Sequence, residues 1–129
     1  MGKTYLLDTN IAIYLLNGTL PLNAQTYLRP ILEETCHLSI VAKIELLGWN
    51  FSLAEDEHKA QAFIADSIIL PLSDAIATKT IELRKHKKLR LGDAIIAATA
   101  FVHDMILLTR NEADFSNLPD LKVVNPFNQ

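Results

Sequence analysis

Short apolar runs alternate along this chain with longer segments of helical periodicity, and this alternation strongly restricts the folds open to it. The runs predicted to be buried strands are 4–7, 37–41, 68–72, 105–108 and 123–124. Segments with helical spacing of apolar residues lie at 11–17, 22–34, 42–49, 54–66, 73–86 and 92–103. Pro30 predicts that the second of these helices is kinked or split into two. The alternation favours an α/β fold with a central, mostly parallel sheet of four to five strands.

The length and composition indicate one small globular domain spanning residues 1–129. Half of the 129 residues are hydrophobic and 21% are charged, which suffices for a continuous core and argues against disorder. Cys36 is the single cysteine, so an internal disulfide is excluded and a reducing cytoplasm is the expected compartment. No apolar stretch approaches the roughly 20 residues of a membrane helix, and we expect neither a membrane role nor a targeting segment.

Four acidic residues follow or lie near the ends of the predicted strands. Asp8 directly follows the first strand, Glu45 lies about one turn into the helix after the second, Asp93 begins an Ala-rich helix, and Asp114 lies six residues beyond Leu108. Ligands of open parallel sheets bind beyond the carboxyl ends of the strands. We therefore expect these four carboxylates to converge on one edge of the sheet.

Each of the four acids also has a purely structural interpretation. Asp8 and Asp93 are both placed to cap a helix N-terminus. Glu45, flanked by apolar residues, either is buried for a functional reason or points to solvent. Asp114 lies in the polar segment 109–114, where an Asx-turn is the ordinary role. The functional interpretation therefore depends on all four together.

Converging carboxylates repel one another, and this repulsion raises their pKa values unless a cation is bound among them. Oxygen-only ligands suit Mg²⁺ or Mn²⁺. Such an ion can stabilise charge on a phosphodiester during hydrolysis. Phosphodiester hydrolysis is therefore the leading chemistry predicted from the acids.

Four segments, in order along the chain, resemble the PIN-domain ribonucleases, and most closely the VapC-type toxins of bacterial toxin–antitoxin pairs. They are Leu7-Asp8-Thr9-Asn10, the helix carrying Glu45, the segment from Gly92-Asp93 to Ala100, and Leu108-Thr109-Arg110-Asn111 with Asp114-Phe115. The resemblance covers essentially the whole chain. It implies a three-layer α/β/α PIN-like fold and a Mg²⁺- or Mn²⁺-dependent endoribonuclease that a cognate antitoxin inhibits.

The resemblance also implies a role for each matching residue. Asp8 and Asp93 would be the principal metal ligands, Asp114 a further ligand that acts directly or through water, and Glu45 a ligand or a water-orienting base. All four are therefore candidate catalytic residues. Polar residues that match supporting positions would hold the acidic cluster by hydrogen bonds: Thr9, Asn10, Thr109 and Asn111.

The formal net charge of −3 argues against a protein that wraps nucleic acid electrostatically, but the basic residues are unevenly placed. Six of the 12 Lys and Arg residues lie within positions 79–90, just before Asp93. We consider two roles for this stretch, a solvated face and a rim that contacts RNA phosphates. Arg110 is a second candidate, either for a phosphate contact or for a salt bridge within the site. The candidate RNA contacts are Arg84, Lys85, Lys87, Lys88, Arg90 and Arg110.

Trp49 and Phe51 form an apolar pair near a predicted helix end. With Tyr14 or Leu16 they would belong to a dimer or antitoxin groove, although core packing is the role that composition favours. We expect a homodimer. Two alternatives to the enzyme stay open: a non-catalytic binding module on the same fold, and a receiver-like phospho-acceptor domain. The second fits poorly, because Asp8 is followed by Thr9-Asn10 rather than by another acid.

Overall fold

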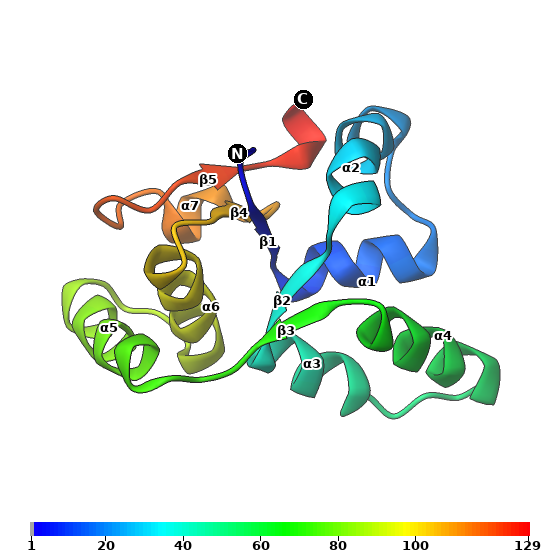
Figure 1. The fold of residues 1–129 in the computed structure, drawn as a ribbon, viewed down its shortest axis with the longest axis horizontal. Coiled ribbons are helices and arrows are strands. Elements are labelled where there is room, and N and C mark those ends of the chain that lie inside the picture. Colours follow the sequence, from blue (N-terminus) through cyan, green and yellow to red (C-terminus); the bar gives the residue numbers. More distant parts are fainter. Residues whose placement is uncertain (1) are drawn as a thin grey trace.

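The computed structural model describes residues 2–129 and contains a five-stranded, entirely parallel sheet in the order β3-β2-β1-β4-β5 (Figure 1). The strands are β1 Tyr5–Leu7, β2 His37–Ser39, β3 Ile68–Leu70, β4 Ile106–Leu108 and β5 Val123–Val124. In the register of the sheet, Leu6 of β1 lies between His37 of β2 and Leu107 of β4. The predicted parallel α/β architecture is confirmed.

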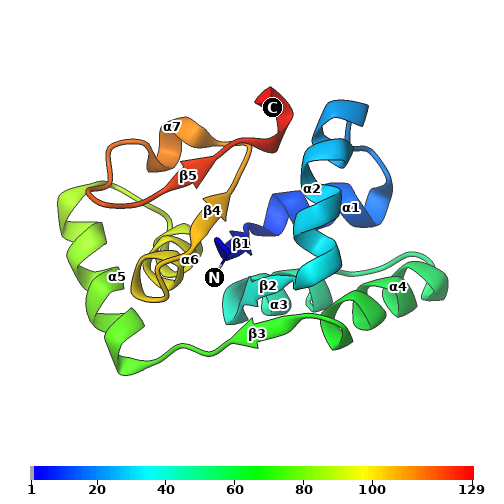
Figure 2. The same cartoon turned by 45° about the horizontal axis from the view of Figure 1, so that its top comes forward.

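Helices cover both faces of this sheet and produce three layers. The helices are α1 Thr9–Asn17, α2 Leu22–Glu34, α3 Ile40–Leu47, α4 Ala54–Ala65, α5 Asp74–His86, α6 Leu91–Val102 and α7 Glu112–Phe115, followed by the 3₁₀ turn η1 Pro126–Asn128. Figures 1 and 2 show α5, α6 and α7 on one side of the sheet and α1 to α4 on the other. Within residues 2–129, no helix is long and apolar enough to cross a membrane.

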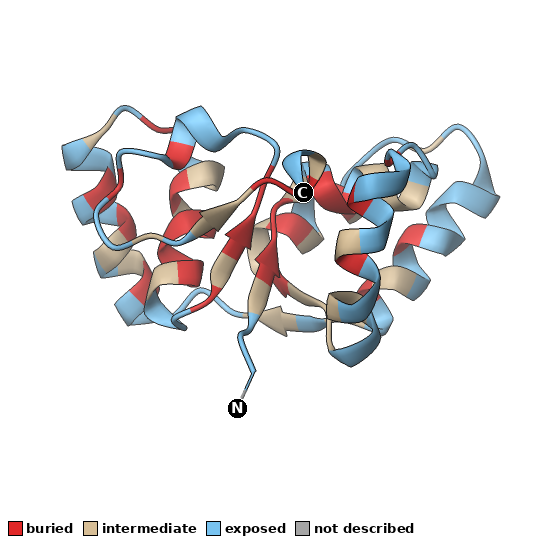
Figure 3. Ribbon diagram, turned by 90° about the horizontal axis from the view of Figure 1, so that it is seen from above, coloured by how far each residue is buried: buried red, intermediate tan, exposed pale blue. Residues whose placement is uncertain are grey.

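The core consists of two apolar layers because neighbouring strand residues point to opposite faces of the sheet. Leu6 and Leu107 pack against α5 and α6, whereas Leu7, Leu38 and Leu108 pack against α1 to α4. Buried residues therefore line the three central strands β2, β1 and β4 and the inner faces of the helices (Figure 3). On α6 the buried side chains are mostly small, and this allows the helix to lie close to the sheet; they include Ala94, Ala97, Ala98 and Ala100.

Two predicted element bounds are wrong, and both errors concern helix caps. The strand expected at 37–41 ends at Ser39, because the Ser39 hydroxyl accepts the N–H of Ala42 at 3.2 Å and starts α3 two residues earlier than expected. Similarly, α6 begins at Leu91 with Arg90 as its N-cap. Asp93 therefore lies in the first turn of α6, and the capping role considered for it is wrong.

Two further differences concern Pro30 and the segment before Asp114. The segment 22–34 is a single helix, so the predicted split at Pro30 does not occur. Pro30 and Thr26 are both exposed, so water can bond the Thr26 carbonyl that the proline leaves without a donor. The polar segment expected to be a loop contains the short helix α7, and Asp114 lies within it.

The edge formed by the carboxyl ends of β1 and β4 is the topological switch point of the sheet. These two strands are neighbours, and the chain leaves β1 into α1 on one face and leaves β4 into α7 on the other. In open parallel sheets the binding crevice lies at such a point. Asp8 and Thr109 are the first residues beyond these two strand ends.

Candidate active site

Asp8 is the most buried of the four predicted acids, with 6% of its surface exposed. One carboxylate oxygen, Oδ1, accepts the backbone N–H of Ile11 at 2.9 Å and caps α1. The other, Oδ2, accepts the hydroxyl of Thr109 at 2.5 Å. Burial raises the pKa of Asp8 above its ordinary value, and the charge of Asp93 adds to this, although both hydrogen bonds favour the ionised form.

Asp93 lies in the first turn of α6, where helix N–H groups favour a negative charge. Burial nevertheless raises its pKa, and the negative charges of Asp114 and Glu45 raise it further, while the nearby Arg90 opposes the shift. Asp93 therefore lies within electrostatic range of the other three acids.

Glu45 lies on α3 with its side chain exposed, so of the two orientations considered the one toward solvent is correct. The hydroxyl of Thr9 donates a hydrogen bond to its Oε1 at 2.5 Å and ties α3 to the start of α1. A Cβ atom at Gly92 would lie 3.3 Å from a methyl group of Val41 and 3.7 Å from the other carboxylate oxygen of Glu45. Glycine at position 92 thus allows the start of α6 to lie close to α3.

Asp114 is exposed on α7. The ammonium group of Lys87, just after α5, donates to the carbonyl of Ala113 at 2.9 Å. This bond ties the segment carrying Asp114 to the end of α5, and α5 in turn packs along α6. Lys87, predicted as an RNA contact, therefore has a structural partner next to the acidic cluster.

The four carboxylates share one edge of the sheet but stand apart from one another. Among residues 2–129, no three Asp, Glu, His or Cys side chains lie close enough together to form a ready-made metal site. None of the four acids takes part in the ion pairs found in that part of the chain. The donor set still suits Mg²⁺, which is commonly held by one or two carboxylates together with water molecules. Burial is the largest cause of the raised pKa values of Asp8 and Asp93, neighbouring acids add to it, and a bound cation would favour the ionised forms.

The polar residues predicted to support the acids differ in what they contact. Thr9 and Thr109 each donate a side-chain hydrogen bond to an acid, as described above. Asn10 and Asn111 have exposed side chains, and among residues 2–129 these side chains make no hydrogen bond to the acidic cluster. Asn111 contributes through its backbone, because its N–H donates to the Thr109 hydroxyl at 3.1 Å.

Among the other predicted RNA contacts, Arg90 acts on Asp93 through its charge, and none forms an ion pair with an acid within residues 2–129. Arg84, Lys85, Lys88 and Arg90 are all exposed on α5 or in the segment that joins α5 to α6. Lys79, earlier on α5, is engaged with other side chains: its ammonium group lies 3.7 Å from the ring centre of Phe101 and forms an ion pair with Glu82.

Arg110 forms no salt bridge with an acid among the described residues, so that interpretation of Arg110 is wrong. Its guanidinium donates to the phenol oxygen of Tyr14 at 2.8 Å and lies over the ring of Phe127, 4.4 Å from the ring centre. Tyr14 consequently packs against Phe127 and does not join the apolar pair formed by Trp49 and Phe51.

A hollow of about 240 Å³ lies between α1, α3 and the start of α4. Trp49 lines it and is 70% exposed, so the expected core packing of this tryptophan is wrong. Leu16 and Phe51 lie beside it, and Glu45 also lines the hollow. An apolar surface therefore leads to one of the candidate catalytic acids.

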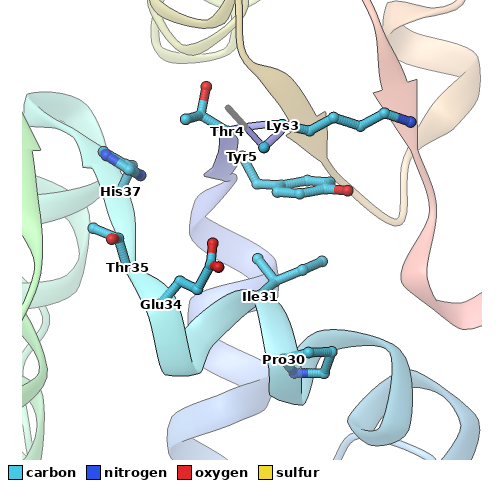
Figure 4. Close-up of a pocket in the computed structure, with 9 residues that line it drawn as sticks. Lys3, Thr4, Tyr5, Pro30, Ile31, Glu34, Thr35 and His37 are labelled. Atoms are coloured by element: carbon cyan, nitrogen blue, oxygen red, sulfur yellow. The ribbon is translucent and has the colours of Figure 1, made fainter.

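A second hollow, of about 310 Å³, lies at the opposite edge of the sheet, near the amino ends of β1 and β2. Figure 4 shows Tyr5, Glu34 and His37 around it. Within residues 2–129 the buried Nδ1 atom of His37 has no hydrogen-bond partner, and burial lowers the pKa of this imidazole. None of the acids predicted for the active site lines this hollow.

Two residues that position the site were not predicted from the sequence. Ser39, fully buried, fixes the start of α3 and hence the position of Glu45. Asn125, also buried, donates to the Arg110 carbonyl at 3.4 Å and accepts the N–H of Phe127 at 2.9 Å. The available signal was a polar residue at the end of an apolar run, Ser39 as the last residue of β2 and Asn125 as the first residue after β5.

The PIN-domain family model matches residues 5–121, from β1 to just before β5. The chain belongs to the PIN-domain family. This membership confirms the predicted fold and the resemblance drawn from the four segments, and it excludes the receiver-like alternative.

Individual PIN-domain proteins resemble the chain as well. It is 32% identical to ribonuclease VapC10 of Mycobacterium tuberculosis over 90 residues, 66% of each protein, so about a third of each lies outside the alignment. Among solved structures, a toxin–antitoxin complex from Klebsiella pneumoniae contains a chain that is 33% identical, with a TM-score of 0.76 over 95% of this chain and 98% of that one. VapBC2 of Rickettsia felis, solved with a promoter DNA fragment, shares the fold at 24% identity, with a TM-score of 0.80 and coverage of 95% and 98%.

Proposed function

We propose that this PIN domain is a Mg²⁺- or Mn²⁺-dependent endoribonuclease that acts as the toxin of a toxin–antitoxin pair. Family membership and the similarity to a protein named ribonuclease VapC10 support a nuclease. The observation that carries the proposal is the pair Asp8 and Asp93, two partly or fully buried carboxylates with raised pKa values at the switch point of the sheet. RNA would be met in the cytoplasm, and we propose that residues 1–129 form one domain acting there.

Asp8 and Asp93 would hold the ion, while Asp114 and Glu45, both exposed, would reach it directly or through water. The bound ion would stabilise negative charge on a phosphate oxygen and make a nearby water more acidic. The protein supplies the positioning. Thr109 fixes the orientation of the Asp8 carboxylate, and Thr9 fixes one oxygen of Glu45, leaving its other oxygen free to orient a water.

The partner we propose is an antitoxin protein that binds in the hollow lined by Leu16, Trp49 and Phe51. Solved relatives of this fold are toxin–antitoxin complexes, which supports a partner of this class. The hollow supports its location, because an exposed tryptophan is a typical anchor for a partner side chain. Since Glu45 lines the same hollow, an occupant would also obstruct the acidic edge. We propose a homodimer as the assembled form.

Cleavage of single-stranded RNA by the purified chain, with Mg²⁺, Mn²⁺ or EDTA, tests the proposal. We expect cleavage with either metal, and a loss of at least a hundredfold in Asp8→Asn and in Asp93→Asn. Asp66→Asn is the matched control, because it makes the same chemical change at an exposed position at the end of α4. Equal cleavage by all four proteins would contradict the assignment.

A non-catalytic binding module is the second candidate, and the spacing of the acids favours it, because no three of them form a ready-made metal site within residues 2–129. Calorimetry with Mn²⁺ separates the two functions. The enzyme requires binding that weakens in Asp93→Asn, whereas a folded wild-type chain that binds no ion and cuts no RNA would establish the binding module.

A further inference from the structure

Arg110 is held in place by two aromatic rings at the edge of the acidic cluster. Its guanidinium donates to the Tyr14 phenol at 2.8 Å, and its central carbon lies 4.4 Å from the ring centre of Phe127. The two rings contact each other edge to face, with centres 5.1 Å apart. The guanidinium therefore has a preferred orientation, although Arg110 is exposed.

The backbone around Arg110 is fixed as well. The N–H of Thr109 donates to the carbonyl of Val124 at 3.0 Å, which extends the pairing of β4 and β5 by one residue. Asn125 then bonds both the carbonyl of Arg110 and the N–H of Phe127. The arginine and its aromatic support are thus held in register by one buried asparagine.

The positive charge of Arg110 is not neutralised by a neighbouring acid. Glu112, two residues further along, accepts a hydrogen bond from Asn128 at 3.0 Å. No ion pair of Arg110 is found within residues 2–129. An arginine carries five N–H donors, and the neutral Tyr14 phenol accepts only from one nitrogen. The remaining donors form a fork suited to an anion with two oxygens.

The position of the Arg110 guanidinium relative to Asp8 indicates which phosphate of a bound RNA it would contact. Tyr14 lies six residues after Asp8, so its backbone is about 9 Å along the helix axis from the candidate metal ligand. Thr109, which contacts Asp8, is directly followed by Arg110. The fork is therefore close to the acidic edge but displaced from it along α1.

From this geometry we propose that Arg110 binds a backbone phosphate of single-stranded RNA that flanks the phosphate being cut. The inference rests on the proposed ribonuclease function and names one contact of its substrate. Arg110 differs from the exposed Lys and Arg residues of 84–90 in being preorganised by Tyr14, Phe127 and Asn125. Arg110 would therefore bind one particular phosphate of the RNA backbone, whereas the Lys and Arg residues of 84–90 would attract the RNA without fixing its position.

A scan with methylphosphonates tests this contact. RNA oligonucleotides, each with one phosphate replaced by a neutral methylphosphonate, are titrated in EDTA against wild type, Arg110→Gln, Tyr14→Phe and Lys3→Gln. In wild type we expect one flanking position to weaken binding about tenfold, as for a hydrogen bond to a charged group. In Arg110→Gln, a methylphosphonate at that position should no longer weaken binding. In Tyr14→Phe, which keeps the ring and removes the hydrogen-bond acceptor, the same methylphosphonate should weaken binding by less than in wild type.

Lys3→Gln is the control, because it removes one positive charge at the opposite edge of the sheet and should keep the wild-type profile. Unfolding temperatures of all variants verify that the fold is retained. If Arg110→Gln shows the same effect of each methylphosphonate on binding as wild type, the inference is overturned. It is also overturned if the position that loses its effect in Arg110→Gln is the phosphate that is cut. Either result leaves the ribonuclease assignment intact. That assignment fails separately, if the wild-type chain neither binds nor cuts RNA.

Discussion

The hydroxyl of Thr109 donates a hydrogen bond to the carboxylate of Asp8, joining residues 101 positions apart at the ends of neighbouring strands. Both residues are buried, so water cannot readily replace the hydroxyl. The bond favours the ionised form of Asp8 and opposes the effect of burial on its pKa. The threonine therefore contributes both to the charge of the site and to the stability of the fold.

Thr109→Val tests this double role, because valine keeps the shape and removes the hydroxyl. We expect the pKa of Asp8 to rise further and the free energy of unfolding at pH 7 to fall by about 1–3 kcal/mol, as for a buried acceptor that loses its donor. Carboxyl-carbon NMR titration measures the pKa, and urea unfolding measures the stability. Thr26→Val, at an exposed position on α2, is the control.

Without metal, Asp93 should make the fold less stable as pH rises. Its pKa is raised by burial and by Asp114 and Glu45, so between its ordinary value and the raised one the folded state binds more protons than the unfolded state. The contribution of Asp93 to the free energy of unfolding is therefore fully present at acidic pH and is lost as the pH rises through the raised pKa. In EDTA at pH 7 we expect Asp93→Asn to unfold at a higher temperature than wild type, with the difference shrinking toward pH 4.

Addition of Mg²⁺ should reverse this order. A cation that binds only the folded chain stabilises wild type by an amount that grows with the logarithm of its concentration relative to Kd, whereas Asp93→Asn loses a proposed principal ligand. If Asp93→Asn is less stable than wild type in EDTA at pH 7, the electrostatic explanation of the raised Asp93 pKa is contradicted.

The basic side chains of 84–90 should control the salt dependence of RNA binding. Each cation that meets one phosphate of a single strand contributes about 0.7 to the slope of log affinity against log salt concentration. The triple variant Arg84→Gln, Lys85→Gln and Lys88→Gln should reduce this slope by about 2 if all three make contacts. Fluorescence anisotropy from 50 to 300 mM salt measures it. An unchanged slope would assign the stretch to a solvated face.

Trp49→Ala should weaken inhibition by the antitoxin at least tenfold, because an exposed tryptophan in a hollow is a typical anchor of an interface. Since the side chain is 70% exposed, its loss should change the unfolding temperature little. The effect is measured by adding the purified antitoxin to each variant and recording how strongly it inhibits RNA cleavage. Ile81→Ala, at an apolar position on α5 that is 58% exposed, is the control, and inhibition equal to wild type in Trp49→Ala would exclude the hollow as the docking place.

The order of the elements and the shared edge of the four acids could be predicted because both depend on local patterns. Apolar runs mark the strands, and parallel topology brings their carboxyl ends together. Two features were missed for different reasons. The capping of α3 by Ser39 is a local contact with Ala42, but Ser39 lies inside the apolar run 37–41 that was assigned to a strand. The stacking of Arg110 on Phe127 joins two separate segments, which only the folded chain brings together. The exposure of Trp49 was mispredicted because hydrophobicity alone does not distinguish a core residue from an apolar residue at the surface.

The capping of α1 by Asp8 affects how loss of function at this position is interpreted. The same carboxylate holds the first turn of a helix and, in our proposal, the metal. Alanine would remove both roles and destabilise the chain by about 1 kcal/mol from the lost cap. Asparagine remains a good capping residue while losing the charge. A genetic screen that scores Asp8→Ala as inactive therefore reports a mixture of lower abundance and lost chemistry, whereas Asp8→Asn reports the chemistry.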